Sequence, residues 1–157
     1  MADGTERFAD AARDLGFEPE IGRFPDGTRT AADAAAAVGC ELGQIVKSLV
    51  FVAGDQPVLV LTSGSNRVDE RLVAAALGVD HVGKADAAMV RSATGFAIGG
   101  TPPFGHVGEL VTLVDTDLFA HDVVWAAAGT PDSCFPIAPD RLAELAGGRR
   151  AAVAAAG

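Results

Sequence analysis

One lysine interrupts an apolar run in a way that could serve chemistry. Lys47 lies within Ile-Val-Lys-Ser-Leu-Val-Phe-Val, residues 45–52. A lysine in such a run is costly unless its ammonium reaches a partner, a cleft or water. Two interpretations are open: the two-residue period of a strand points Lys47 to solvent, or Lys47 is a cation at the mouth of a cleft. In the second case it could hold a phosphate or polarise an ester carbonyl.

A second candidate is the segment from Thr94 to His106, which contains Gly99-Gly100-Thr101-Pro102-Pro103. Paired glycines allow positive φ and close approach of the backbone, and paired prolines remove two N–H donors and stiffen the chain. A rigid loop of this kind exposes backbone amides and carbonyls and suits recognition of a small polar group. The alternative is an ordinary tight turn, for which glycine and proline are the usual residues.

Two further segments are weaker candidates, and the first of them follows an apolar strand. Thr62-Ser63-Gly64-Ser65-Asn66 is either a phosphate-contacting loop or a loop that caps the next helix. The small residues of Trp125-Ala-Ala-Ala128-Gly129-Thr130 either form the floor of a pocket or only permit close packing.

Several common chemistries receive no support from spacing. The three histidines and two cysteines form no HxxxH, HExxH or CxxC pattern, so no metal site is expected. There is no GxSxG elbow, and no phosphate-binding or dinucleotide-binding glycine motif in its required context. We therefore expect no metal and no organic cofactor.

The elements that must position these residues alternate between helix and strand. Apolar spacing, capping residues and turn signals predict helices at residues 5–15, 30–38, 68–77, 84–93 and 139–145, and strands at 17–24, 46–53, 58–62, 110–114 and 123–128. Thr5 is expected to cap the first helix, and the second and third strands to form a central hairpin. This order predicts a mixed α/β fold with helices packed on the sheet.

The length of 157 residues predicts one domain over residues 1–157, with a core at about 5–145 and a frayed or weakly helical tail at 147–157. No apolar run reaches the ~18 residues of a membrane span, and the acidic N-terminus is not typical of a secretory signal. We expect a soluble cytoplasmic protein with free thiols. The net charge of −9 argues against nonspecific binding to nucleic acid, and neither DNA nor a membrane is an expected partner.

Four blocks of the chain together resemble the YbaK/EbsC family, which includes the editing domains associated with prolyl-tRNA synthetase. The blocks are residues 28–32 (Thr-Arg-Thr-Ala-Ala), 43–51 (Gly-Gln-Ile-Val-Lys-Ser-Leu-Val-Phe), 95–106 (Gly-Phe-Ala-Ile-Gly-Gly-Thr-Pro-Pro-Phe-Gly-His) and 124–131 (Val-Trp-Ala-Ala-Ala-Gly-Thr-Pro). The resemblance extends over about residues 5–145. It implies a barrel-like mixed sheet wrapped by helices.

The resemblance also implies an activity, which is deacylation of mischarged tRNA in trans, typically alanyl or cysteinyl esters on proline tRNA. The family lysine maps onto Lys47 and the family GxxxP loop onto residues 99–103. Lys47, Gly99 and Gly100 are accordingly the expected catalytic residues. The expected substrate-binding residues are Thr30, Ser63, Gly64, Asn66, Thr101, Pro102, Pro103, His106, Ala128 and Gly129. The expected partners are aminoacyl-tRNA and an aminoacyl-tRNA synthetase.

Three functions remain open on the sequence. The first is the deacylase, with a small aliphatic amino acid such as alanine as the first expectation, because Ala127 and Cys134 stand where cysteinyl deacylases carry polar residues. The second is a non-catalytic module that binds aminoacyl-tRNA or a synthetase, which the acidic charge favours. The third is a hydrolase of small amino esters. Direct capture of tRNA would need a basic rim, for which the candidates are Arg23, Arg29, Lys47, Arg67 and Arg71.

Overall fold

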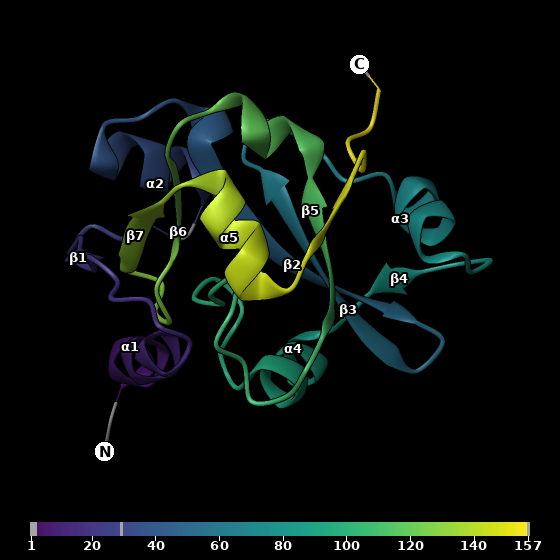
Figure 1. Ribbon diagram of the computed structural model, residues 1–157, viewed down its shortest axis with the longest axis horizontal. Coiled ribbons are helices and arrows are strands. Elements are labelled where there is room, and N and C mark those ends of the chain that lie inside the picture. Colours follow the sequence, from purple (N-terminus) through teal and green to yellow (C-terminus); the bar gives the residue numbers. More distant parts are fainter. Residues whose placement is uncertain (1–2, 29, 157) are drawn as a thin grey trace.

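The computed structural model describes residues 3–28 and 30–156, which form a mixed sheet covered by helices on both faces (Figure 1). The strand order is β1-β7-β6-β2-β3-β5-β8, with β4 paired to β2 outside this path. The strands are β1 (Gly22–Arg23), β2 (Ile45–Ala53), β3 (Gln56–Ser63), β4 (Gly83–Lys84), β5 (Val111–Asp115), β6 (Val124–Ala127), β7 (Ser133–Ile137) and β8 (Arg149–Ala151). The mixed α/β prediction is confirmed, although the sheet is open because its described end strands, β1 and β8, do not pair with each other.

Helices on the two faces enclose separate cores. The helices are α1 (Gly4–Asp14), α2 (Ala31–Val38), α3 (Glu70–Leu77), α4 (Ala87–Thr94) and α5 (Pro139–Ala146), with short 3-10 helices η1 (Leu42–Gln44) and η2 (Thr116–Ala120). The larger core joins α1, α4 and α5 to one face of the sheet through side chains such as Phe8, Val90 and Leu142. On the opposite face α3 packs on β3 and β5, and α2 packs on the start of β2. Among the described residues, no helix has the length and apolar character needed to cross a membrane.

The central hairpin is confirmed. Strands β2 and β3 pair antiparallel from Val46–Ser63 to Ala53–Gln56, and this register places Lys47 opposite Thr62. Because side chains alternate along a strand, Val46, Ser48 and Val50 share one face of β2, and Lys47 lies on the other. The first face belongs to the larger core, in which Val46 and Val50 are buried. The hairpin thus presents Lys47 and Ser48 to opposite sides of the sheet.

Capping residues and prolines in the sequence correctly predicted the start of some helices and not of others. Thr30 caps α2 by accepting the N–H of Asp33 at 3.0 Å, and α5 begins with Pro139, as predicted. The prediction that Thr5 caps the first helix is wrong, because Asp3 accepts the Glu6 N–H and the helix begins one residue earlier. The predicted helix at 84–93 begins only at Ala87, since residues 83–84 pair with β2 as β4.

Two predictions of strand and tail are wrong. Of the expected strand at 17–24 only β1 is present, and its partner β7 was not predicted at all. The tail at 147–157 was expected to be frayed or weakly helical, but β8 extends the sheet beside β5. Val153 is fully buried in the core beneath α3, which explains why the tail is held in place.

Candidate active site

The two edges of β2 are paired very differently. Strand β3 covers one edge from Val46 to Ala53. On the other edge β6 pairs only with residues 45–46, β4 pairs only with residues 51–52, and the Ala85 N–H donates to the Val50 carbonyl at 3.1 Å. Within the described chain, residues 47–49 therefore have no strand partner on this side. The sheet has a gap at the position of Lys47 and Ser48.

A cavity of about 620 Å³ lies at this gap, within the range of roughly 300–1,000 Å³ that is usual for ligand sites. Its lining comes from both faces of β2, with Ile45 and Lys47 on one side and Ser48 and Val50 on the other. Five of the residues predicted from the sequence line it, namely Thr30, Lys47, Gly64, Gly99 and Thr101. The lysine and the glycine loop, which are about 50 positions apart in the sequence, thus border one hollow.

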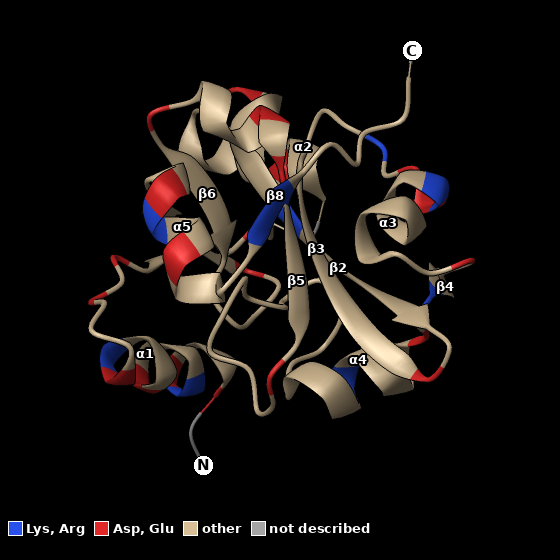
Figure 2. Ribbon diagram, turned by 45° about the vertical axis from the view of Figure 1, so that its right-hand side comes forward, with Lys and Arg blue, Asp and Glu red and all other residues tan. Residues whose placement is uncertain are grey.

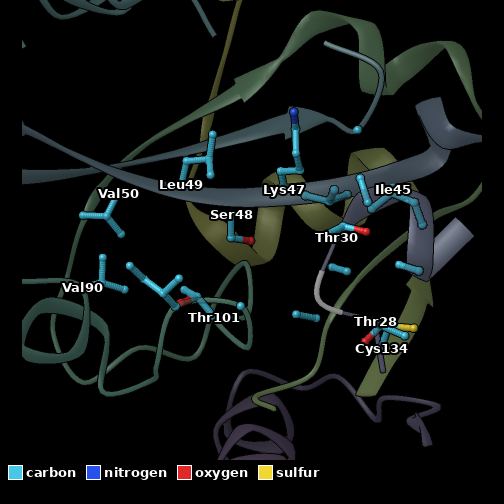
Figure 3. Close-up of a pocket in the computed structure, with 18 of the residues that line it drawn as sticks. Thr28, Thr30, Ile45, Lys47, Ser48, Leu49, Val50, Val90, Thr101 and Cys134 are labelled. Atoms are coloured by element: carbon cyan, nitrogen blue, oxygen red, sulfur yellow. The ribbon is translucent and has the colours of Figure 1, made fainter. Parts of the chain in front are cut away.

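Lys47 is half-buried, and its side chain extends to the opposite side of β2 from Ser48 and Thr101 (Figure 3). Its Nζ donates to the backbone carbonyl oxygen of Asn66 at 2.5 Å. Burial lowers the pKa of Lys47, the nearby Asp115 carboxylate opposes that shift, and Arg67 adds to it. The ammonium is therefore already partly desolvated before any substrate binds.

Asp115 organises the loop that holds Lys47. The residue is 1% exposed, and its carboxylate accepts four hydrogen bonds, from Thr62 Oγ1 (2.8 Å), the Ser63 N–H (3.0 Å), Asn66 Nδ2 (2.8 Å) and the Asp117 N–H (3.0 Å). Burial by itself raises the pKa of Asp115, but the hydrogen bonds outweigh it, that of Asn66 foremost, and the net shift is downward. An ionised Asp115 thus fixes Asn66, whose carbonyl receives Lys47.

Close contacts and a hydrogen bond define the shape of the 99–103 loop, and the sequence suggested them only in part. Gly99 has φ of +90° and a Cβ added to it would meet open space, which fits its place on the cavity wall. Gly100 is instead pressed against Thr130, where an added Cβ would lie 2.8 Å from the Thr130 Cα. Thr101 Oγ1 donates to the Ala97 carbonyl at 3.0 Å and closes the turn.

His106 forms a hydrogen bond to this loop but does not line the cavity. Its Nε2 lies 2.7 Å from the Pro102 carbonyl oxygen, so this nitrogen carries the proton that the carbonyl accepts. Burial lowers the pKa of His106, against the smaller opposite effect of that hydrogen bond. Pro102 and Pro103 are both buried. The three residues support the shape of the loop and do not line the cavity.

Other predicted site residues also lie outside the cavity wall. Ser63 and Asn66 belong to the Asp115 network behind Lys47. Ala128 is fully buried in the larger core, and a side chain at Gly129 would overlap the backbone of Gly4. The structure thus gives Ala128 and Gly129 a packing environment, and their predicted role in binding substrate stays a prediction.

Several lining residues were not among the site residues predicted from the sequence, although the segment that begins at Trp125 was a candidate pocket floor and Ala127 and Cys134 were considered for substrate choice. Thr28, Ser48, Lys84 and Trp125 border the cavity, as do Ala127 and Cys134, which face each other as a cross-strand pair between β6 and β7. Ser48 had a signal, because a polar residue alternates with Val46 and Val50 in an otherwise apolar strand. Lys84 had none, since it was assigned to a helix. Burial raises the pKa of the Cys134 thiol to about 11, which keeps it neutral.

The proposed basic rim is partly neutralised. Arg23 pairs with Asp3 at 2.6 Å and with Asp132 at 3.3 Å, and Arg71 pairs with Asp69 at 3.4 Å. Arg29 lies outside the described residues. Acidic and basic residues are interspersed on α1, α3 and α5 (Figure 2). Of the described candidates, Lys47 and Arg67 are near each other, and Lys84 is a further cation on the cavity wall.

Comparison with known proteins gives consistent results. The profile of the aminoacyl-tRNA editing domain matches residues 25–145. The chain is 29% identical over 129 residues to the uncharacterized protein YwhH of Bacillus subtilis (strain 168), and the match covers 82% of each protein. It is 36% identical over 101 residues to a proline–tRNA ligase of Leuconostoc mesenteroides, and this match covers 64% of this chain but only 17% of the ligase.

Two solved structures share the whole architecture. One, described as a candidate trans-editing enzyme for prolyl-tRNA synthetase, superposes with a TM-score of 0.93 at 41% identity and covers 99% of both chains. The hypothetical protein APE2540 superposes with a TM-score of 0.87 at 26% identity, covering 96% of this chain and 100% of that one.

Proposed function

Because the chain belongs to the aminoacyl-tRNA editing domain family, we propose that it is a deacylase that acts in trans on mischarged tRNA. The substrate is a small aminoacyl ester of the alanyl or cysteinyl type, and the carrier is proline tRNA. The observation that carries this proposal is the cavity at the gap in the sheet, which Lys47 and the 99–103 loop both border.

Lys47 would hold the terminal adenosine or the ester end of the substrate. An ammonium has three N–H donors, and the Asn66 carbonyl takes one of them. The remaining donors are available to an oxygen of the ribose, a phosphate or the ester. Partial burial strengthens any such contact, because an electrostatic interaction gains strength as water is excluded.

The 99–103 loop would grip the aminoacyl group and orient a water molecule. No aspartate, glutamate or histidine is among the described residues that line the cavity, so catalysis would come from positioning and electrostatic stabilisation. The water oxygen adds to the ester carbonyl carbon and the water gives up a proton, the bond from that carbon to the ribose oxygen breaks, and the ribose oxygen takes up the proton that the water released. The neighbouring ribose hydroxyl can relay that proton.

The cavity wall favours a small acyl group with little discrimination. The lining includes several short side chains, among them Ser48, Thr101, Ala127 and Cys134, and the Cys134 thiol is neutral because burial raises its pKa to about 11. Apolar pockets separate side chains that differ by one methylene by only ~1–3 kcal/mol. We therefore expect overlapping rates on alanyl and cysteinyl tRNA.

The charge of the chain favours a partner that delivers tRNA. The net charge is −9, and two of the arginines proposed for a basic rim are ion-paired. An aminoacyl-tRNA synthetase is the proposed partner. The same observation supports the second candidate function, a non-catalytic module that binds aminoacyl-tRNA or a synthetase.

A deacylation panel tests the proposal. The purified protein is assayed against tRNA charged with Ala, Cys, Ser, Thr or Pro, and against a minimal alanyl ester without RNA. Faster release of Ala or Cys than of Pro from tRNA supports the deacylase. Release from the minimal ester at the same efficiency would identify a small-ester hydrolase instead, and binding without turnover would identify the non-catalytic module.

A further inference from the structure

Trp125 borders the cavity on the same side of the sheet as Lys47. Strands β6 and β2 are parallel here, with Trp125 in register with Ile45. Paired residues of neighbouring strands point to the same face, and Trp125 packs with Ile45 against α2. Lys47 is two residues beyond Ile45 and therefore shares that face. The indole and the ammonium thus border the same half of the cavity.

The surroundings of the ring leave it available to a flat ligand. Trp125 is only partly buried, and its neighbours from α2 on the cavity wall are the small side chains Ala31 and Ala34. Phe51 is the other aromatic residue among the described lining residues, but it is 2% exposed and belongs to the core beneath α3. Trp125 is therefore the one described aromatic side chain that can present a ring to this cavity.

The other half of the cavity has a different character. Val50, Val90, Ser48 and Thr101 line it, and Figure 3 places these four on the opposite side of β2 from the Lys47 side chain. The Ser48 hydroxyl is buried without a hydrogen-bond partner. This half is mostly apolar, with isolated polar atoms, and suits a small acyl group rather than a charged nucleotide.

We propose that Trp125 is the stacking platform for the terminal adenine of the tRNA acceptor end, with Lys47 beside it for the ribose and phosphate. This inference rests on the proposed function, and it fixes the direction of the substrate. The nucleoside lies on the α2 side of the sheet, the ester crosses the gap at residues 47–49, and the acyl group reaches Ser48 and Thr101. Stacking of a base on an aromatic ring is tolerant of sequence and is not an attraction between opposite charges, which suits an acidic chain.

Intrinsic fluorescence provides a direct test, because the chain contains one tryptophan and no tyrosine. The probe is the trinucleotide CCA with a free 3′ end, and the control is the same trinucleotide with an abasic terminal ribose. We expect CCA to quench the emission of Trp125 and the abasic form to leave it unchanged. Equal quenching by both, or no quenching by either, would overturn the inference.

Three variants separate stacking from packing, with the dissociation constant for CCA measured by calorimetry. Trp125→Phe keeps an aromatic face and should retain most of the affinity. Trp125→Leu keeps apolar bulk but has no π-face and should weaken binding about 10- to 100-fold. Val38→Ala removes volume from the same α2 cluster away from the cavity wall and should bind CCA like the unmodified protein. Binding by Trp125→Leu that matches the unmodified protein would contradict stacking.

These measurements need no turnover, so they are independent of the deacylation panel. Base-dependent quenching in a protein that deacylates nothing would reject the deacylase and retain the nucleoside site. Active deacylation with equal binding of CCA and its abasic form would retain the deacylase and reject the role of Trp125.

Discussion

The two edges of β2 are built for different purposes. Along β3 the pairing is continuous over residues 46–53, and the facing residues Leu59, Val60 and Leu61 are fully buried. Along the other edge the partners β6 and β4 leave residues 47–49 unpaired. Continuous pairing and burial stabilise the sheet, whereas the interruption leaves room for a ligand beside exposed backbone groups.

The polar groups on the two sides differ in the same way. On the β3 side the carboxylate of Asp115 accepts hydrogen bonds from four donors. The side-chain amide of Asn66 donates to Asp115, and its backbone carbonyl accepts from Lys47. On the gap side the Ser48 hydroxyl is buried with no partner. An unsatisfied buried polar group costs stability, which is the expected signature of a place that is completed by a substrate.

The largest effect is expected from Lys47→Ala. Removing a donor that stabilises developing charge typically lowers turnover by about 10²–10³-fold, so deacylation of alanyl-tRNA should become nearly undetectable. The fold should persist, because Lys47 is only half-buried, and thermal melting followed by circular dichroism checks this. Lys84→Ala removes the other lysine from the same cavity and should have a much smaller effect. Unimpaired turnover in Lys47→Ala would remove this residue from the mechanism.

Asp115→Asn should destabilise the protein by weakening the hydrogen-bond network on the β3 side of β2. The amide cannot accept all the donors that now point at the carboxylate, and the expected cost is about 3 kcal/mol in the free energy of unfolding, measured by urea denaturation. The pKa of Asp115 is lowered in the folded protein, so its contribution is present above the unfolded value of 3.8 and is lost as the pH falls through the folded pKa. The difference between the two proteins should therefore be full at pH 7 and shrink below pH 3.8. A difference that does not depend on pH would contradict this account.

Gly100→Ala should move the loop rather than fill the cavity. The added Cβ would lie 2.8 Å from the Thr130 Cα, and the expected result is about a tenfold fall in kcat/KM with about 1–2 kcal/mol of stability lost to overpacking. Gly108→Ala is the matched control, because a Cβ there meets nothing within 4 Å. Steady-state kinetics and melting of both variants test the placement, and equal behaviour of the two would refute it.

The smallest effect concerns the reactivity of Cys134. Burial raises the pKa of its thiol to about 11, so the reactive thiolate is scarce at neutral pH. Alkylation by iodoacetamide should be slow at pH 7.5 and accelerate as the pH approaches 11, as followed by mass spectrometry of the Cys134 peptide. Rapid labelling of this peptide at pH 7.5 would show that the cavity wall is more open than the structure describes.

Prediction from the sequence succeeded where the signal is local. The hairpin, the Thr30 cap and the start of α5 at Pro139 depend on residues a few positions apart, and the structure has all three. Strand β7 was missed because Pro136 argues against a strand, although β6 precedes it by a short connection, and its other partner β1 comes from the N-terminal part of the chain. The tail looked unstructured because it consists mostly of alanine and glycine, and it is held by the pairing of β8 with β5 and by the burial of Val153 in the core beneath α3.

By itself, the sequence determined that Lys47 stands in an apolar strand and that residues 99–103 form a stiff, glycine-containing bend. Both properties follow from residue type and from neighbours along the chain. Only the tertiary structure decided that Gly99 faces the cavity while Gly100 presses on Thr130, and that Trp125 shares a face with Lys47. Those facts depend on which strands pair and in what register, and register is set by burial of the sheet as a whole.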